Sequence, residues 1–208
     1  MMISHRVAAY FSFVLSIAAA LVLCGCSTTE TQTQTGGVKI DPSIIAVSTP
    51  GIQVQQGASF AWMENAINLY KDERLDSTTI QYLIERSIKT NLADMGFKFV
   101  ESEAVADYTI AYTAALESSL DDTTILRRYG LVPGNMRVPQ DNPDYEKGTL
   151  LIYAFDAGTG DMVWRSAVQA AVDFSLDEQA RKQRIGPIIQ DMFRTLPTRQ
   201  VPVDSYTK

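Results

Sequence analysis

The chain has 208 residues, of which 46% are hydrophobic, and a formal net charge of −6 with a single histidine. This length and composition suffice for one domain with an ordinary hydrophobic core. A negative chain lacks the basic surface that phosphate backbones attract, so we expect no nucleic-acid partner.

The first 25 residues are typical of a secretory signal peptide. His5 and Arg6 form a short basic start, and an apolar run from Val7 to Leu23 follows. The run is slightly shorter than the roughly 20 apolar residues that span a membrane. This favours a cleaved signal peptide over an uncleaved membrane helix.

The segment Leu23-Cys24-Gly25-Cys26 resembles the lipobox of bacterial lipoproteins. The resemblance implies cleavage between Gly25 and Cys26, a diacylglycerol on the Cys26 thiol and an acyl chain such as palmitate on its new amine. Several acyl chains together hold a protein firmly on a membrane. Ser27 follows, where an Asp would favour inner-membrane retention, so the resemblance implies an outer-membrane lipoprotein facing the periplasm. Beyond these covalent lipids we expect no cofactor and no metal.

The chain that remains after cleavage contains no histidine and no free thiol, because His5 and Cys24 lie in the signal peptide. Loss of Arg6 makes it one unit more negative, at −7. Without imidazole and thiol, Ser-His-Asp and Cys-His catalysis are excluded, and the commonest transition-metal ligands are missing. We therefore expect a protein that is not an enzyme.

Four regions follow from these signals. Residues 1–25 are the signal peptide, and residues 26–37 are the lipidated cysteine with a polar linker that is too hydrophilic to fold. Residues 38–200 form one α+β domain, and residues 201–208 form a C-terminal tail.

The first half of the domain predicts strands around one long helix. Turn residues in 38–57 predict extended structure, and "ASFAWM" at 58–63 predicts a strand with Phe60 and Trp62 on one face. Asp76 is a plausible N-cap and Gly96 a C-cap for an amphipathic helix between them. Two further strands are expected at 97–102 and 106–117.

The second half predicts a hairpin and a last helix. "DAGTGD" at 156–161 joins two β runs, and its Asp156 and Asp161 are expected to bond turn amides. A capping box beginning at Ser175 starts the helix, which Pro187 should kink or split. These elements predict an α+β fold, a mostly antiparallel sheet with two amphipathic helices packed on one face.

Five segments together resemble the bacterial lipoprotein family DUF4136, a domain of unknown function. They are "SFAWM" (59–63), "LADMGF" (92–97), "ADYTIAY" (106–112), "GTLLIYAFDAGTGDMVWRSAV" (148–168) and "MFRTLP" (192–197). The resemblance spans roughly Ile44 to Pro197, and it departs at Ser166, where many relatives have Gly. It implies the fold and the envelope location, and no reaction or ligand.

The segment from Glu117 to Gly148 predicts a loop that is unusually long for a connection without its own structure. It mixes apolar, aromatic and Arg residues, the composition of interface cores. Two readings stay open: an interaction loop for an envelope protein partner, or a flap folded onto its own domain. The candidate interaction residues are Arg127, Arg128, Tyr129, Met136 and Arg137.

Other polar and aromatic residues favour structural roles. Asp121, Asp122, Asp141, Asp144 and Glu146 could hold Ca²⁺ but lack EF-hand spacing, so solvated loop charges are the better interpretation. Trp62 and Trp164 are expected in the core, although either could stack on a ligand. The basic group of Arg181, Lys182 and Arg184 predicts a solvated helix face.

The leading hypothesis is a non-enzymatic outer-membrane lipoprotein with a periplasmic binding or scaffolding domain. The first alternative is a carrier for a lipid or other apolar ligand, enclosed between the helices and the sheet. The second is an envelope hydrolase that works with paired carboxylates.

Overall fold

A computed structural model describes residues 41–132, 134, 136, 138 and 142–199. The predicted signal peptide, the cleavage site at Gly25 and Cys26, the linker and the tail lie outside the described residues, as do Arg137 and Asp141. The four predicted regions and the lipid attachment therefore stay predictions.

The described part of the chain contains strands and helices in the following order. They are β1 (Ser43–Ser48), β2 (Ser59–Leu69), α2 (Ser77–Asp94), β3 (Lys98–Phe99), the 3₁₀ turn η1 (Glu103–Val105), β4 (Tyr108–Leu116), α3 (Asp122–Tyr129), β5 (Tyr145–Asp156), β6 (Met162–Asp173) and α4 (Glu178–Phe193).

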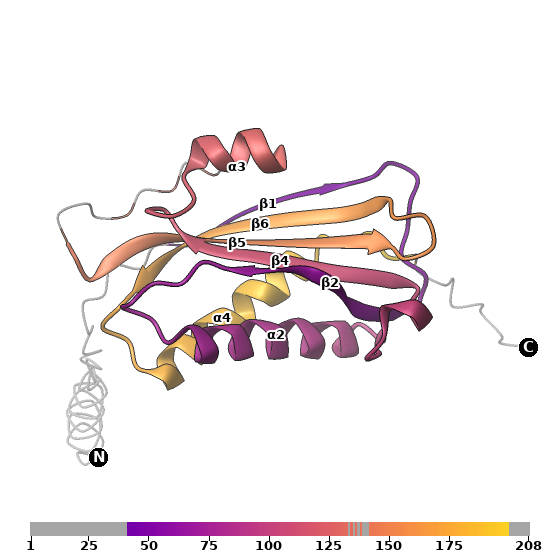
Figure 1. The fold of residues 1–208 in the computed structure, drawn as a ribbon, viewed down its shortest axis with the longest axis horizontal. Helices are drawn as coiled ribbons and strands as arrows, with labels where there is room; N and C mark the ends of the chain where they lie inside the picture. The colour runs from indigo at the N-terminus through magenta and orange to yellow at the C-terminus, as the bar shows by residue number, and fades with distance from the viewer. Residues whose placement is uncertain (1–40, 133, 135, 137, 139–141, 200–208) are drawn as a thin grey trace, which may run out of the picture. The chain divides into compact units, whose positions relative to one another are not determined.

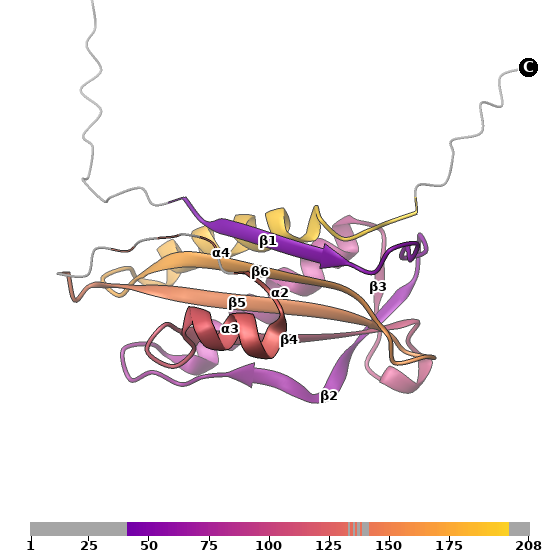
Figure 2. The same cartoon turned by 90° about the horizontal axis from the view of Figure 1, so that it is seen from above.

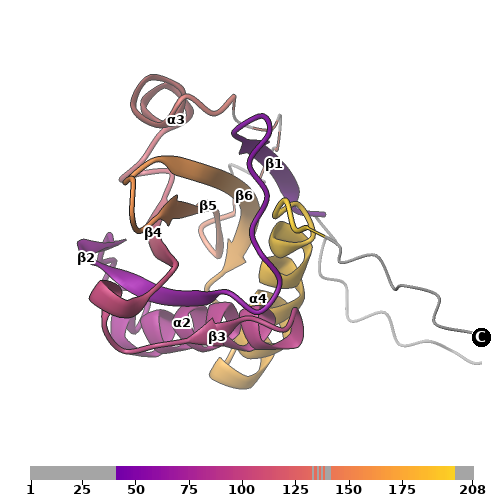
Figure 3. The ribbon, with the colours of Figure 1, turned by 90° about the vertical axis from the view of Figure 1, so that its right-hand side faces the viewer.

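The six strands form one curled sheet in the order β1-β6-β5-β4-β2-β3 (Figure 3). The pairs β1–β6, β6–β5 and β5–β4 are antiparallel. Strand β2 runs parallel to both of its neighbours, β4 and β3. The two parallel pairs arise because α2 carries the chain back across the sheet after β2. At the β1 edge, buried Ser166 donates its hydroxyl to the Ile45 carbonyl at 3.2 Å, which gives the departure from the family pattern a structural role.

Helices α2 and α4 cover one face of the sheet, as predicted (Figures 1 and 2). The main apolar cluster lies between them and the strands, and its largest side chain is Trp164, 1% exposed. The predicted stripe of α2 is buried there through Leu83, Ile84, Ile88 and Leu92. Among the described residues, the buried members of both apolar clusters run from Val54 to Leu196.

The ends of α2 agree with the sequence signals. The Asp76 carboxylate accepts a hydrogen bond from the Thr78 amide at 3.0 Å, and Gly96 adopts a φ of +85° just past the last turn. A side chain at Gly96 would be strained in this left-handed conformation, which is why glycine ends the helix.

The last helix differs from its prediction at its start, and Pro187 does not split it. Its N-cap is Asp177, which accepts from the Ala180 amide at 2.8 Å, whereas the Ser175 hydroxyl donates to Asp173. The helix also continues through Pro187 without a break. Pro187 lacks an N–H, but the apolar side chains after it, including Ile189 and Phe193, hold the following turns against the core.

The prediction of a long loop between Glu117 and Gly148 is partly wrong, because this segment contains α3 and the first residues of β5. The local signals for α3 are an Asp121 N-cap, bonded to the Thr124 amide at 2.7 Å, and Gly130 at the C-cap with a φ of +60°. This third helix packs on the opposite face from α2 and α4 (Figure 1). Ile125 is buried there against Leu151.

Candidate functional site: an apolar pocket at one end of the sheet

An open pocket of about 170 Å³ lies between the sheet and the first turns of α2 and α4. We call it the end pocket. Figure 1 shows these first turns toward the left end of the sheet. Apolar side chains from every surrounding layer line the pocket, namely Leu69, Ile80, Ile84, Leu150, Val168 and Ile188. Its volume is close to that of engineered dry cavities of ~150 Å³ that bind benzene.

The pocket is hollow because one row of the sheet carries small side chains. Gly148 of β5 lies beside Ala170 of β6 in the register. A Cβ at Gly148 would lie 2.5 Å from Cγ2 of Val172, so a larger residue there would force Val172 to move. Ala170 is half-buried and lines the opening.

Two arginines of α4 line the pocket. Arg181 donates from Nη2 to the Phe174 carbonyl at 3.2 Å, and Arg184 donates from Nη2 to the Ala171 carbonyl at 3.1 Å. Within the described part of the chain neither forms an ion pair with a carboxylate, and the buried Nε of Arg181 has no hydrogen-bond partner.

Asp173 is the acidic side chain that lines the pocket in the described residues. Burial by itself raises its pKa. Hydrogen bonds from Ser175 and Tyr145, and the positive charge of Arg184, outweigh burial, and the pKa of Asp173 falls below its ordinary value. The carboxylate is therefore ionised, and its oxygens already accept hydrogen bonds from Ser175 and Tyr145. The two arginines are the charged groups of the pocket that form no ion pair within the described residues.

The sequence anticipated a cavity between helices and sheet as its carrier alternative, but it named no residue for it. The basic group of α4 was interpreted as solvated, which holds for the exposed Lys182 and is wrong for Arg181 and Arg184, both half-buried. Their i,i+3 spacing, which places them on one face of a helix, was the available signal.

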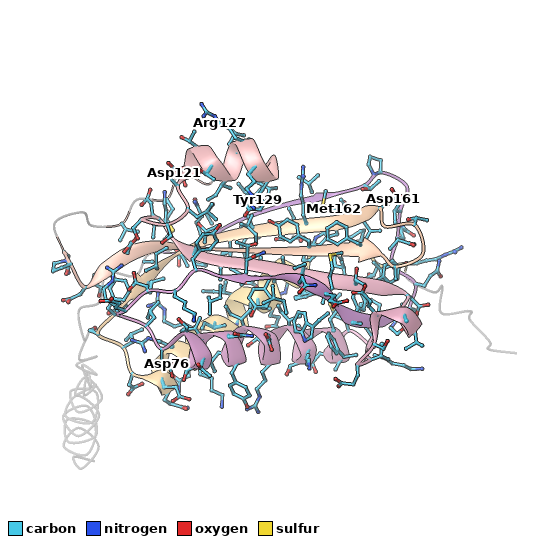
Figure 4. The ribbon with its side chains drawn as sticks, viewed as in Figure 1. Asp76, Asp121, Arg127, Tyr129, Asp161 and Met162 are labelled. Carbon is cyan, nitrogen blue, oxygen red and sulfur yellow. The ribbon has the colours of Figure 1, made fainter. Side chains whose placement is uncertain are left out.

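The predicted interaction residues separate into two groups. Arg127 and Arg128 are exposed, and Figure 4 shows Arg127 on the side of α3 away from the sheet. Tyr129 is half-buried, with its ring centroid 6.0 Å from that of Tyr153, and Met136 is also half-buried. Arg137 lies outside the described residues. Ile125 and Leu131 of the segment thus pack onto their own domain, whereas Arg127 and Arg128 face solvent.

Three of the acidic residues considered for Ca²⁺, namely Asp121, Asp122 and Glu146, have structural partners. Asp122 bonds Lys147, and Glu146 bonds the Ser118 amide and pairs with Arg74. Across the described ranges, no group of three potential metal-binding side chains comes together. Asp144 and the N-cap Asp121 belong to no such group.

The two tryptophans lie on the helix-covered side of the sheet. Trp164 is in the core, where its indole N–H donates to Thr195 Oγ1 at 3.0 Å. Trp62 is half-buried, and its ring centroid lies 5.1 Å from that of Phe99 and 5.9 Å from that of Tyr112.

None of the helices in the described part is long and apolar enough to cross a membrane.

Together, the fold and the pocket define a single α+β domain with an open apolar site. The chain belongs to the family DUF4136, a domain of unknown function, whose model matches residues 48–198. The resemblance seen in the sequence is thereby confirmed, and the family carries no assigned enzymatic activity. No curated protein matches the chain.

Several solved structures are distantly similar. A DUF4136 family protein from Bacteroides thetaiotaomicron has 11% identity and a TM-score of 0.49, with 78% of this chain and 100% of that chain covered. The PelC dodecamer from Paraburkholderia phytofirmans has 10% identity and a TM-score of 0.43, over 77% and 100%. Lipoprotein GNA1162 from Neisseria meningitidis has 9% identity and a TM-score of 0.36, over 66% and 98%. These similarities are too distant to transfer a function.

Proposed function

We propose that the protein is a non-enzymatic, lipid-anchored lipoprotein of the outer membrane whose periplasmic domain binds a ligand with an apolar group. The end pocket is the observation that carries this function. Concave, mostly apolar sites with a few polar groups are the usual form of small-molecule sites, and this one is open to solvent. The lipobox of the sequence supports the anchor.

The polar residues of the described domain support a binding role over a catalytic one. The carboxylates of Asp121, Asp122 and Glu146 serve a helix cap and ion pairs. A carboxylate hydrolase would need two such groups facing an open site. The acid at the end pocket, Asp173, is held by Ser175 instead.

The anchor is tested by fractionating cells that express the full chain. Replacement of Cys26 by Ala removes the acylated thiol, so the protein should leave the membrane pellet on alkaline washing. A Ser27→Asp variant should keep the lipid and move from the outer to the inner membrane. Retention of the Cys26→Ala protein in the pellet would overturn the lipid anchor, and an unmoved Ser27→Asp protein would count against outer-membrane sorting.

Ligand binding is tested with the chain from Ser27 onward, which contains all the residues that the structure describes. Native mass spectrometry after gentle purification should show a stoichiometric small-molecule adduct, which Ala170→Leu should remove by filling the pocket. Ala104→Leu is the matched control, since Ala104 is exposed on η1. Clean apo masses from several growth conditions, or equal adducts on both variants, would contradict the proposal.

A second candidate function is docking of an envelope protein on the outer side of α3. Leu126 and Val132 are 48% and 67% exposed there, beside Arg127 and Arg128. A photoreactive residue at position 126 should then crosslink to a discrete protein in cells, whereas one at exposed Tyr82, on α2, should not. Equal patterns at both positions would set this candidate aside.

A further inference from the structure

The end pocket has a cationic side and an apolar floor. Arg181 and Arg184 lie one turn apart on α4, and both line the pocket together with side chains such as Leu150 and Val168 from the sheet. A ligand that fills the floor therefore lies beside two arginine side chains.

Among the residues that the structure describes, most hydrogen-bond donors of these arginines have no protein partner. Each guanidinium has five N–H donors, and each is seen to donate one hydrogen bond, to the carbonyl of Phe174 or of Ala171. The Nε of Arg181 is buried without a partner. An unsatisfied buried donor on a charged group is costly, and an anion in the pocket would satisfy it.

The other charges around the pocket offset only part of this pair, through the interaction of Asp173 with Arg184. Asp173 is held by the amide and hydroxyl of Ser175 at 2.9 and 2.6 Å. Arg74, whose guanidinium lies 4.1 Å from the ring centroid of Phe174, is itself paired with Asp72 and Glu146. The residues that line the pocket thus carry two positive charges and one negative charge.

From this arrangement we infer that the ligand is an anionic amphiphile, with a carboxylate or phosphate head on Arg181 and Arg184 and a single alkyl chain on the apolar floor. This inference rests on the proposed binding function and names the class of its ligand. The pocket holds about six carbon atoms, by comparison with the benzene-sized cavity of ~150 Å³. A longer chain would extend into solvent through the opening.

The test is calorimetric titration of the chain from Ser27 onward with ligands that differ only in the head group. Octanoate and octyl phosphate should bind about tenfold or more tightly than octanol, because charge-assisted hydrogen bonds are lost with the neutral head. Comparing the two anions shows which head group the site prefers. Across butanoate, hexanoate, octanoate and decanoate, affinity should rise about fourfold per methylene and level off near six carbons.

Variants locate the head group. The double change Arg181→Gln and Arg184→Gln should remove the preference for octanoate over octanol, whereas Lys182→Gln, at an exposed position, should keep it. Octanol binding as tightly as octanoate would overturn the anionic head while leaving the pocket function intact. If no compound of the series binds, the proposed function itself fails. The comparison of octanoate with octanol on the unaltered chain tests the anionic head group even if a variant does not fold.

Discussion

The ammonium Nζ of Lys147 on β5 lies 2.8 Å from the Oδ2 of Asp122 in the first turn of α3. It also lies 2.8 Å from Glu117, and the lysine is only 5% exposed. Burial lowers the pKa of Lys147, but hydrogen bonds to Asp122 and Glu117 outweigh this and raise it, so the side chain stays charged. Gln169 adds a bond to Asp122 at 2.7 Å. Helix α3 is thereby tied to the sheet.

Replacing Lys147 by Met should therefore loosen α3. The two carboxylates are partly exposed and regain water, so we expect a loss of about 2 kcal/mol in the free energy of unfolding, below that of a fully buried pair. Urea unfolding measures the loss, and amide exchange should accelerate in α3. Arg194→Met is the control, because the Arg194 pair with Asp191 is exposed and contributes little. Unchanged exchange in α3 would show that Lys147 does not hold it.

Gly148→Ala should destabilise the domain by about 1–3 kcal/mol through overpacking, because the new methyl meets Val172. The double variant with Val172→Ala should recover most of this loss, which thermal unfolding of the four proteins of the cycle would measure. Simple addition of the two effects would mean that the destabilisation arises elsewhere than at this contact.

Thr195→Val should cost about 1–2 kcal/mol in unfolding free energy. It keeps the shape of the side chain and leaves the buried indole N–H of Trp164 without its acceptor. Chemical denaturation followed by tryptophan fluorescence would report both the stability and the altered indole environment. Thr90→Val, at an exposed position of α2, makes the same substitution and should change stability little. Equal effects at the two positions would assign the loss to the substitution itself.

The stability contributed by Asp107 should disappear in acid. Its carboxylate accepts two hydrogen bonds from Ser59, one from the amide at 2.8 Å and one from the hydroxyl at 2.7 Å. These bonds hold the pKa of Asp107 below its ordinary value. Because the folded pKa is lowered, the contribution is complete above the unfolded value of about 4 and is lost as pH falls through the folded value. Asp107→Asn should therefore cost about 1 kcal/mol at neutral pH.

The difference between Asp107→Asn and the unaltered protein should shrink in urea titrations below about pH 4. Glu101→Gln, an exposed neighbour, serves as the control. A difference that is independent of pH would assign the effect of Asp107 to packing rather than to its charge.

Local sequence signals predicted much of the fold. The hairpin at 156–161 forms as expected, with Asp156 accepting from the amides of Gly158 and Thr159 at 2.9 Å each. No such bond to the side chain of Asp161 is seen, and the amide of Asp161 instead donates to the hydroxyl of Thr159. Signals of this kind succeed because a turn or cap is built from residues adjacent in the chain.

Helix α3 shows where the local signals were outweighed. Its Asp121 cap and Gly130 end were present in the sequence, but the prolines and glycines around them favoured a loop. Its stability comes from burial of Ile125 and Leu131 against β5 and β6, and from Lys147 far along the chain. These contacts depend on the sheet order, which periodicity does not contain.

The sequence by itself determined the α+β class, the amphipathic face of α2 and the family resemblance, because periodicity, caps and turns depend on near neighbours. Only the tertiary structure decided that Gly148 and Ala170 lie side by side and leave space for the end pocket. It also decided that Arg181 and Arg184 line this pocket. The reason is that a pocket is made by residues from separate strands and helices, and their meeting is set by strand order and register.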